Sequence, residues 1–219
     1  MPECALIGRE HCSQWLFDDD SGAGWITSPK LRLKASLDRA EMTIYEHIEQ
    51  MKPFIKRTDW AGLEEEFCAL AENLGGTGTA KPIRSLDFGG YQRALSSGLD
   101  QAKRTASRLA ARAIYLEYDL DNDWESTFFL CKEYRSEAAD DDDWACDYVQ
   151  TIPGPAFPEA SAIYDENGFD RTPLATGSTL YLIARTVASF GRVACLAPSG
   201  SLPICIAYHD QDPIFRISD

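Results

Sequence analysis

The chain has 219 residues, of which 44% are hydrophobic, and it carries a formal net charge of −14 at pH 7. A chain of this length and composition can bury one sizeable core, and no long low-complexity linker divides it, so we expect a single domain over 1–219. The excess of carboxylates argues against direct binding to nucleic acid or to an anionic membrane, because phosphate contacts need an excess of Lys and Arg.

The sequence also bears on the compartment. Its first eight residues lack the basic start and apolar core of a secretory signal. The longest apolar run, 178–197, contains Arg185 and Arg192, whose burial at the centre of a bilayer would be costly. The seven cysteines form no CxxC pair, which argues against a disulfide framework and against a zinc ribbon. We therefore expect a cytoplasmic protein without a membrane-spanning segment.

The first part of the chain, 1–112, predicts mainly helices. From Ser36, a candidate N-cap, apolar residues recur at spacings of three and four as far as Met51, and Pro53 limits the regular continuation of that helix. A second helix is predicted over 59–74, with Gly75 and Gly76 as its stop.

A third helix is predicted over 90–112, although Gly98 weakens its pattern. Arg104, Arg108 and Arg112 recur every four residues along it and form a basic ridge. This ridge is either a solvated face or an internal partner for the acidic segment that follows.

The segment 113–147 holds twelve Asp and Glu residues against Lys132 and Arg135, and so carries ten of the fourteen net negative charges. Two runs rich in β-branched and aromatic residues, 113–120 and 127–134, flank turn-forming residues and predict a β-hairpin. In the first run apolar residues alternate with Glu117 and Asp119, so one face of the strand is apolar and the other acidic.

The remainder of the chain predicts a mixture of elements. We expect a strand within 144–152, a short helix over 160–166, a buried helix over 179–190 that stops at Gly191, and a terminal hairpin formed by 203–208 and 214–217. The fold class is therefore α+β, with a helical N-terminal part packed on an antiparallel sheet that carries a buried C-terminal helix and a terminal hairpin.

Two patterns in the sequence bear on catalysis or metal binding. Asp119, Asp121 and Asp123 match the opening of an EF-hand loop, but Trp124 stands where that loop needs Gly, and Leu130 where it needs Glu. An improvised cation site at this tip stays open as an alternative.

Cys205, His209 and Asp210 form the tightest Cys/His/Asp group, without a nucleophile motif around it. No complete catalytic constellation is visible, and ligand-type residues are too dispersed for a closed metal site. We therefore expect no catalytic residue, no metal and no cofactor.

Aromatic residues among the carboxylates predict a protein-binding surface, because buried rings contribute affinity while charges contribute orientation and speed of association. The alternative is that both tryptophans cover the core of the sheet. The residues predicted to bind a partner are Glu117, Asp119, Asp121, Asp123, Trp124, Glu125, Asp140, Asp141, Asp142, Asp143 and Trp144.

Over 115–144 and 209–215, the chain resembles the small acidic cytoplasmic immunity proteins that bacteria pair with secreted toxins. The likeness is one of size, acidity, α+β composition and a patch of carboxylates with aromatic residues. It implies a protein without catalytic activity that binds and neutralises a cognate toxin, one with a basic cleft. A small metal-dependent or hydrolytic enzyme that uses the Asp119, Asp121 and Asp123 tip is the alternative, and a general acidic adaptor is a third.

Overall fold

The computed structural model describes residues 42–139, 141–196, 202–211 and 214–218, and the statements below refer to these residues. The helices, in chain order, are α2 (Ile44–Glu49), α3 (Lys52–Lys56), α4 (Trp60–Gly75), α5 (Ala80–Arg84), α6 (Phe88–Leu109), α7 (Pro158–Asn167) and α8 (Pro173–Ala194). The 3-10 turns are η1 (Glu137–Ala139) and η2 (Asp143–Cys146). The strands are β1 (Ala113–Tyr118), β2 (Ser126–Cys131), β3 (Tyr148–Pro153), β4 (Ile204–Tyr208) and β5 (Phe215–Ser218).

The five strands form one sheet in the order β3-β2-β1-β4-β5. The predicted hairpin is present as β1 and β2, and the predicted terminal hairpin as β4 and β5, both antiparallel. The expectation of a wholly antiparallel sheet was wrong, because β4 lies parallel to β1. The crossover between them contains the long α8, as a parallel connection requires. The fold class is α+β, and within the described residues every strand follows residue 112.

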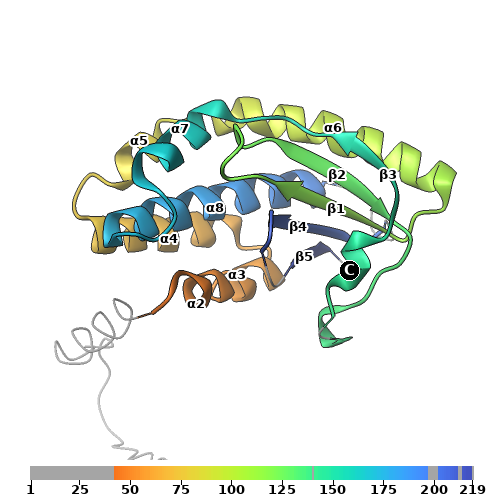
Figure 1. Ribbon diagram of the computed structural model, residues 1–219, viewed down its shortest axis with the longest axis horizontal. Helices are drawn as coiled ribbons and strands as arrows, with labels where there is room; N and C mark the ends of the chain where they lie inside the picture. The colour runs from red at the N-terminus through yellow and green to blue at the C-terminus, as the bar shows by residue number, and fades with distance from the viewer. Residues whose placement is uncertain (1–41, 140, 197–201, 212–213, 219) are drawn as a thin grey trace, which may run out of the picture. The chain divides into compact units, whose positions relative to one another are not determined.

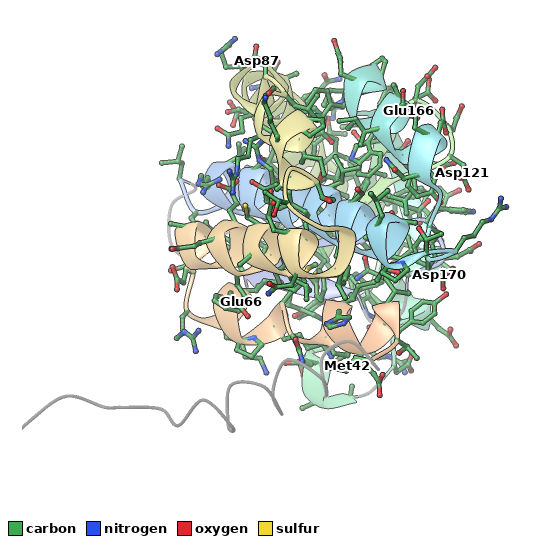
Figure 2. The ribbon with its side chains drawn as sticks, turned by 90° about the vertical axis from the view of Figure 1, so that its left-hand side faces the viewer. Met42, Glu66, Asp87, Asp121, Glu166 and Asp170 are labelled. Atoms are coloured by element: carbon green, nitrogen blue, oxygen red, sulfur yellow. The ribbon has the colours of Figure 1, made fainter. Side chains whose placement is uncertain are left out.

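One face of the sheet is covered by α6 and α8, and α4 packs along the far side of α8 (Figure 1). Inward residues of β1, such as Ile114 and Leu116, share this core with Leu95 and Leu99 of α6. In Figure 2, α4 lies across the front of α8. Because α8 is enclosed on both sides, seventeen of its 22 residues are buried. None of the described helices is both long enough and apolar enough to cross a membrane.

The ends of several helices follow from local side chains. Asp59 caps α4 by accepting a hydrogen bond from the Gly62 amide at 3.0 Å, and Asp87 caps α6 in the same way. Thr43 and Glu46 form a capping box at the start of α2, a signal that the sequence reasoning missed. Ser36, the N-cap predicted for this helix, lies outside the described residues. Pro53 lies in the first turn of α3, where its missing amide hydrogen costs nothing, so a new helix begins there.

Two glycines are needed for close packing inside helices. A Cβ at Gly98 of α6 would lie 2.6 Å from Phe128 Cε2, and one at Gly191 would lie 2.5 Å from Trp60 Cη2. The prediction that Gly191 ends its helix was therefore wrong. Gly191 lies inside α8, which runs on to Ala194, and it is there to admit the indole ring of Trp60 from α4.

Replacing Gly191 with Ala should destabilise the protein by about 1–3 kcal/mol, because the added methyl group overlaps a buried ring that has little room to move. Urea denaturation measures the loss. In a Trp60→Leu background the same change should cost much less, since the opposing ring is gone. An equal cost in both backgrounds would contradict this packing account.

Candidate functional site

The second face of the sheet has its own small core, formed by the other set of alternating side chains. It is covered by the acidic segment that joins β2 to β3, 132–147. The buried members of this core are Ala113, Tyr115, Cys131, Trp144, Ala145, Cys205, Ala207 and Ile214. Burial raises the pKa of the Cys131 thiol to about 12 and also raises that of Cys205, so both thiols stay protonated at neutral pH.

Trp144 holds the covering segment against the sheet. Its ring lies 5.2 Å from that of Tyr134, edge to face, and the Arg216 guanidinium of β5 lies 5.7 Å from its centroid. These contacts bury Trp144 to 3% exposure. Its side chain is therefore part of the interior and has no surface to offer a partner.

Asp142 joins the same segment to β5. Its carboxylate forms an ion pair with Arg216 and accepts a hydrogen bond from the Ile214 amide at 2.8 Å. The Arg216 side chain is 8% exposed, so this pair is largely withdrawn from water. Asp141 is likewise paired with Arg135. Two of the four consecutive aspartates, Asp141 and Asp142, are thus paired with arginines, and the pair with Arg216 ties the segment to β5.

Beside this covering segment the second face is hollowed into an open cavity of about 830 Å³. It reaches from β3 across β2 and β1 to the loop between β4 and β5. Among the described residues, six carboxylates and two cations line it, and aromatic rings from three strands form part of its wall. The lining residues are Lys52, Tyr115, Glu117, Phe129, Glu137, Asp141, Asp142, Asp143, Ala145, Cys146, Tyr148, Asp210, Gln211, Ile214 and Arg216.

Both cations in the cavity already have carboxylate partners. Arg216 pairs with Asp142, and the Lys52 Nζ lies 2.8 Å from Glu49 and 3.8 Å from Glu137. Two further carboxylates, Asp143 and Asp210, are exposed. Two more of its carboxylates pair with cations outside the lining, Glu137 with Lys56 and Asp141 with Arg135. Among the described residues, the carboxylates of the cavity that no Lys or Arg balances are therefore Glu117, Asp143 and Asp210.

Glu117 is the best-organised of the cavity carboxylates. It accepts a hydrogen bond from the Tyr115 hydroxyl at 3.0 Å, and it lies 3.2 Å from Nδ1 of His209. The hydrogen bond to Glu117 raises the pKa of His209, and the charges of Glu117, Asp210 and Asp119 act in the same direction. The Tyr115 ring stacks on Phe129 with centroids 5.7 Å apart, so the carboxylate stands at the end of an aromatic wall.

The hairpin turn that carries Asp119, Asp121 and Asp123 does not line this cavity. Asp119 Oδ1 accepts a hydrogen bond from the Asp121 amide at 2.9 Å, and the Asp121 carboxylate is hydrogen-bonded to Tyr164 of α7. Figure 2 shows Asp121 on the same side of the protein as Glu166 of α7. Within the described residues no group of three or more His, Cys, Asp or Glu side chains is placed to hold a metal ion.

Trp124 is the last residue of that turn and is fully buried. Its indole Nε1 donates to Thr186 Oγ1 of α8 at 3.1 Å, so the ring anchors the hairpin to the main core. The expectation that it anchors a partner was wrong, as it was for Trp144, because neither ring is accessible. Glu125 is exposed beside the turn, and Asp140 lies outside the described residues.

The other candidate groupings do not assemble. Cys205 lies buried in β4, whereas His209 is exposed and turned to Glu117, so the Cys205, His209 and Asp210 group forms no nucleophilic site. Arg104 and Arg108 are exposed on α6, which covers the opposite face of the sheet. Of the two alternatives for that ridge, the structure shows the solvated face.

Sequence reasoning did not assign Lys52, Tyr115, Phe129 or Asp210 to a partner-binding site, although the structure brings all four to this cavity. Strand alternation places Tyr115, Glu117 and Phe129 on one face, and this signal was available. Lys52 and Asp210 come to the cavity from distant parts of the chain, and only tertiary structure brings them there.

Comparison of the chain with protein-family models gave no match, and comparisons with curated proteins and with solved structures gave none either. Function is therefore argued from the geometry of this face.

Replacing Asp142 with Asn should destabilise the protein by about 2 kcal/mol, because the buried Arg216 loses the carboxylate that balances its charge. Chemical denaturation measures this. The matched change Asp143→Asn alters an exposed neighbour and should fall within about 0.5 kcal/mol of the parent. An equal loss of stability in the two variants would show that Asp142 does not hold the segment to β5.

Replacing Glu117 with Gln should lower the pKa of His209, since the hydrogen bond to the carboxylate is the main cause of its rise. A raised folded-state pKa stabilises the fold below the ordinary value of 6.5, and this contribution disappears as pH rises through the folded pKa. An NMR titration of His209 measures the change, with the signal assigned by a His209→Gln variant. Asp210→Asn should lower the pKa of His209 by less than Glu117→Gln does. A larger effect of Asp210→Asn would contradict Glu117 as the main cause of the raised pKa.

Proposed function

We propose that this protein is an inhibitor that binds a basic protein partner at the acidic cavity of the second face. The carrying observation is the cavity of about 830 Å³, in which three carboxylates, Glu117, Asp143 and Asp210, have no Lys or Arg partner among the described residues and stand beside an aromatic wall. A concave acidic site of this kind fits Lys or Arg side chains that project from a partner.

The aromatic rings give such a partner more than a charge to contact. Tyr148 is 43% exposed and packs edge to face on Phe129, with centroids 5.0 Å apart. A guanidinium group that enters the cavity can lie over these rings while its nitrogens donate to Glu117, Asp143 or Asp210. Tyr148 thus takes the anchoring role that sequence reasoning assigned to the two tryptophans.

An immunity protein is the kind of inhibitor that we propose. A toxin that acts on an anionic substrate, such as a nucleic acid or a nucleotide, must display Lys and Arg in its cleft. A protein that presents carboxylates to that cleft occupies the place of the phosphates and blocks the substrate. The action would take place in the cytoplasm of the producing cell, with no catalytic step by this chain.

Two variants with equal loss of charge test the proposal. One carries Glu117→Gln, Asp143→Asn and Asp210→Asn in the cavity, and the other Asp119→Asn, Asp121→Asn and Asp123→Asn at the turn. The toxin candidate is the product of the neighbouring open reading frame. The parent protein should restore growth of cells that express this toxin. The cavity variant should bind about tenfold or more weakly and protect less.

The turn variant serves as the control. It should chiefly slow association at low ionic strength, where screening is least, and should still protect. Equal affinity of the parent and the cavity variant would refute the cavity as the binding site. Failure of the parent to protect cells from the neighbouring gene product would refute the immunity role for that pair.

A further inference from the structure

Among the residues that the structure describes, strand β3 forms an open edge of the sheet beside the cavity. It is the outermost strand of the order β3-β2-β1-β4-β5, and five of its six residues are exposed. Its sequence, Tyr-Val-Gln-Thr-Ile-Pro, contains no charged residue, and Val149 is 42% exposed. Edge strands are usually protected from pairing by Lys or other charges, by covering elements or by bulges. Here the described protection is a register shift opposite Leu130 and Cys131, together with Pro153.

The opposite edge of the sheet is different. There β5 has α3 packed beside it (Figure 1). The two edges therefore differ in access, and the accessible one adjoins the acidic cavity, because Tyr148 both begins β3 and lines that cavity.

The direction of the backbone groups of β3 follows from its register with β2. Gly154 donates its amide to the Ser126 carbonyl at 2.8 Å, and Ile152 and Gln150 are the residues two and four positions earlier in the ladder. Their amides therefore point toward β2, and the amide and carbonyl of Thr151 point outward. The side chain of Thr151, opposite Phe129, lies on the cavity face of the sheet.

We propose that the basic partner contributes an extended segment that adds to the outer edge of β3 as a further strand. This proposal rests on the proposed function, since it describes how the same partner is held. Backbone hydrogen bonds to Thr151 supply affinity and register. Alternate side chains of the added strand lie on the cavity face, where Lys or Arg residues extend past Tyr148 into the acidic cavity.

A synthetic peptide that alternates Arg and Val is the probe. Its affinity for the full chain is measured by fluorescence anisotropy beside that of a peptide N-methylated at alternate amides, which keeps the charge but cannot pair as a strand. The unmodified peptide should bind about tenfold more tightly or better, and it should slow hydrogen exchange at the Thr151 amide. Equal affinity of the two peptides, or no binding by either, would overturn the proposal.

Variants of the protein separate pairing from charge. Thr151→Pro removes an outward donor, a change that an edge strand tolerates, and should weaken binding about tenfold. Val149→Glu adds electrostatic attraction for a basic peptide. It should nevertheless weaken binding, because it places a charge on the edge of β3 that the peptide covers when it binds. The control Leu174→Glu makes the same kind of change at a residue that is 40% exposed on α8, and should not weaken it. Normal binding by both edge variants would refute strand addition.

The cavity variant described above distinguishes this proposal from the one it rests on. If the three cavity replacements weaken peptide binding while Thr151→Pro does not, the acidic cavity binds the cation and strand addition fails. If Thr151→Pro weakens binding and the cavity replacements have no effect, strand addition stands and the cavity is not the binding site.

Discussion

The packing of α8 between α4 and the sheet is the constraint on which the rest of the structure depends. Small residues let its neighbours approach closely: a Cβ at Gly177 would lie 3.0 Å from Ala71 Cα, and one at Gly191 would overlap Trp60. The charged groups of α8 leave the interior at its edges. Arg185 lies over the Phe88 ring, and Arg192 pairs with Glu64 at 2.9 Å. With α6 and α8 on one face of the sheet, the other face is left to the acidic segment between β2 and β3.

That acidic segment is held by a second, smaller set of contacts in which charge has a structural part. Trp144 contributes the buried area, and Asp142 and Arg216 fix the segment to β5. Burying this ion pair has a desolvation cost that its attraction and hydrogen bonds must offset, so it contributes to specific placement more surely than to stability. The consequence is that the cavity beside it has a defined wall.

Local patterns were sufficient to predict much of the fold. The hairpin of β1 and β2, the helix α4 and the terminal strands each follow from periodicity and from capping or turn residues within a few positions. The errors are non-local. The parallel pairing of β4 with β1 depends on α8 crossing the sheet, and Gly191 resembles a helix stop until Trp60 is seen to fill the space beside it. Trp124 was misjudged for the same reason, since its partner Thr186 lies 62 residues away.

In the candidate site, too, local features could be predicted from the sequence and non-local contacts could not. Charge density along the sequence located the acidic segment, but it could not separate carboxylates that are tied to the fold from those that remain available. Asp142 and Asp143 are neighbours, yet the first is bound to Arg216 and the second is exposed. Glu117, Asp143 and Asp210 come from β1, from η2 and from the loop after β4, and only the folded sheet brings them to one cavity. An unfolded chain of equal charge would still attract basic proteins, but it would lack the aromatic wall and the fixed spacing. If the cavity binds a basic partner as we propose, recognition of that partner depends on the same packing that buries the two tryptophans.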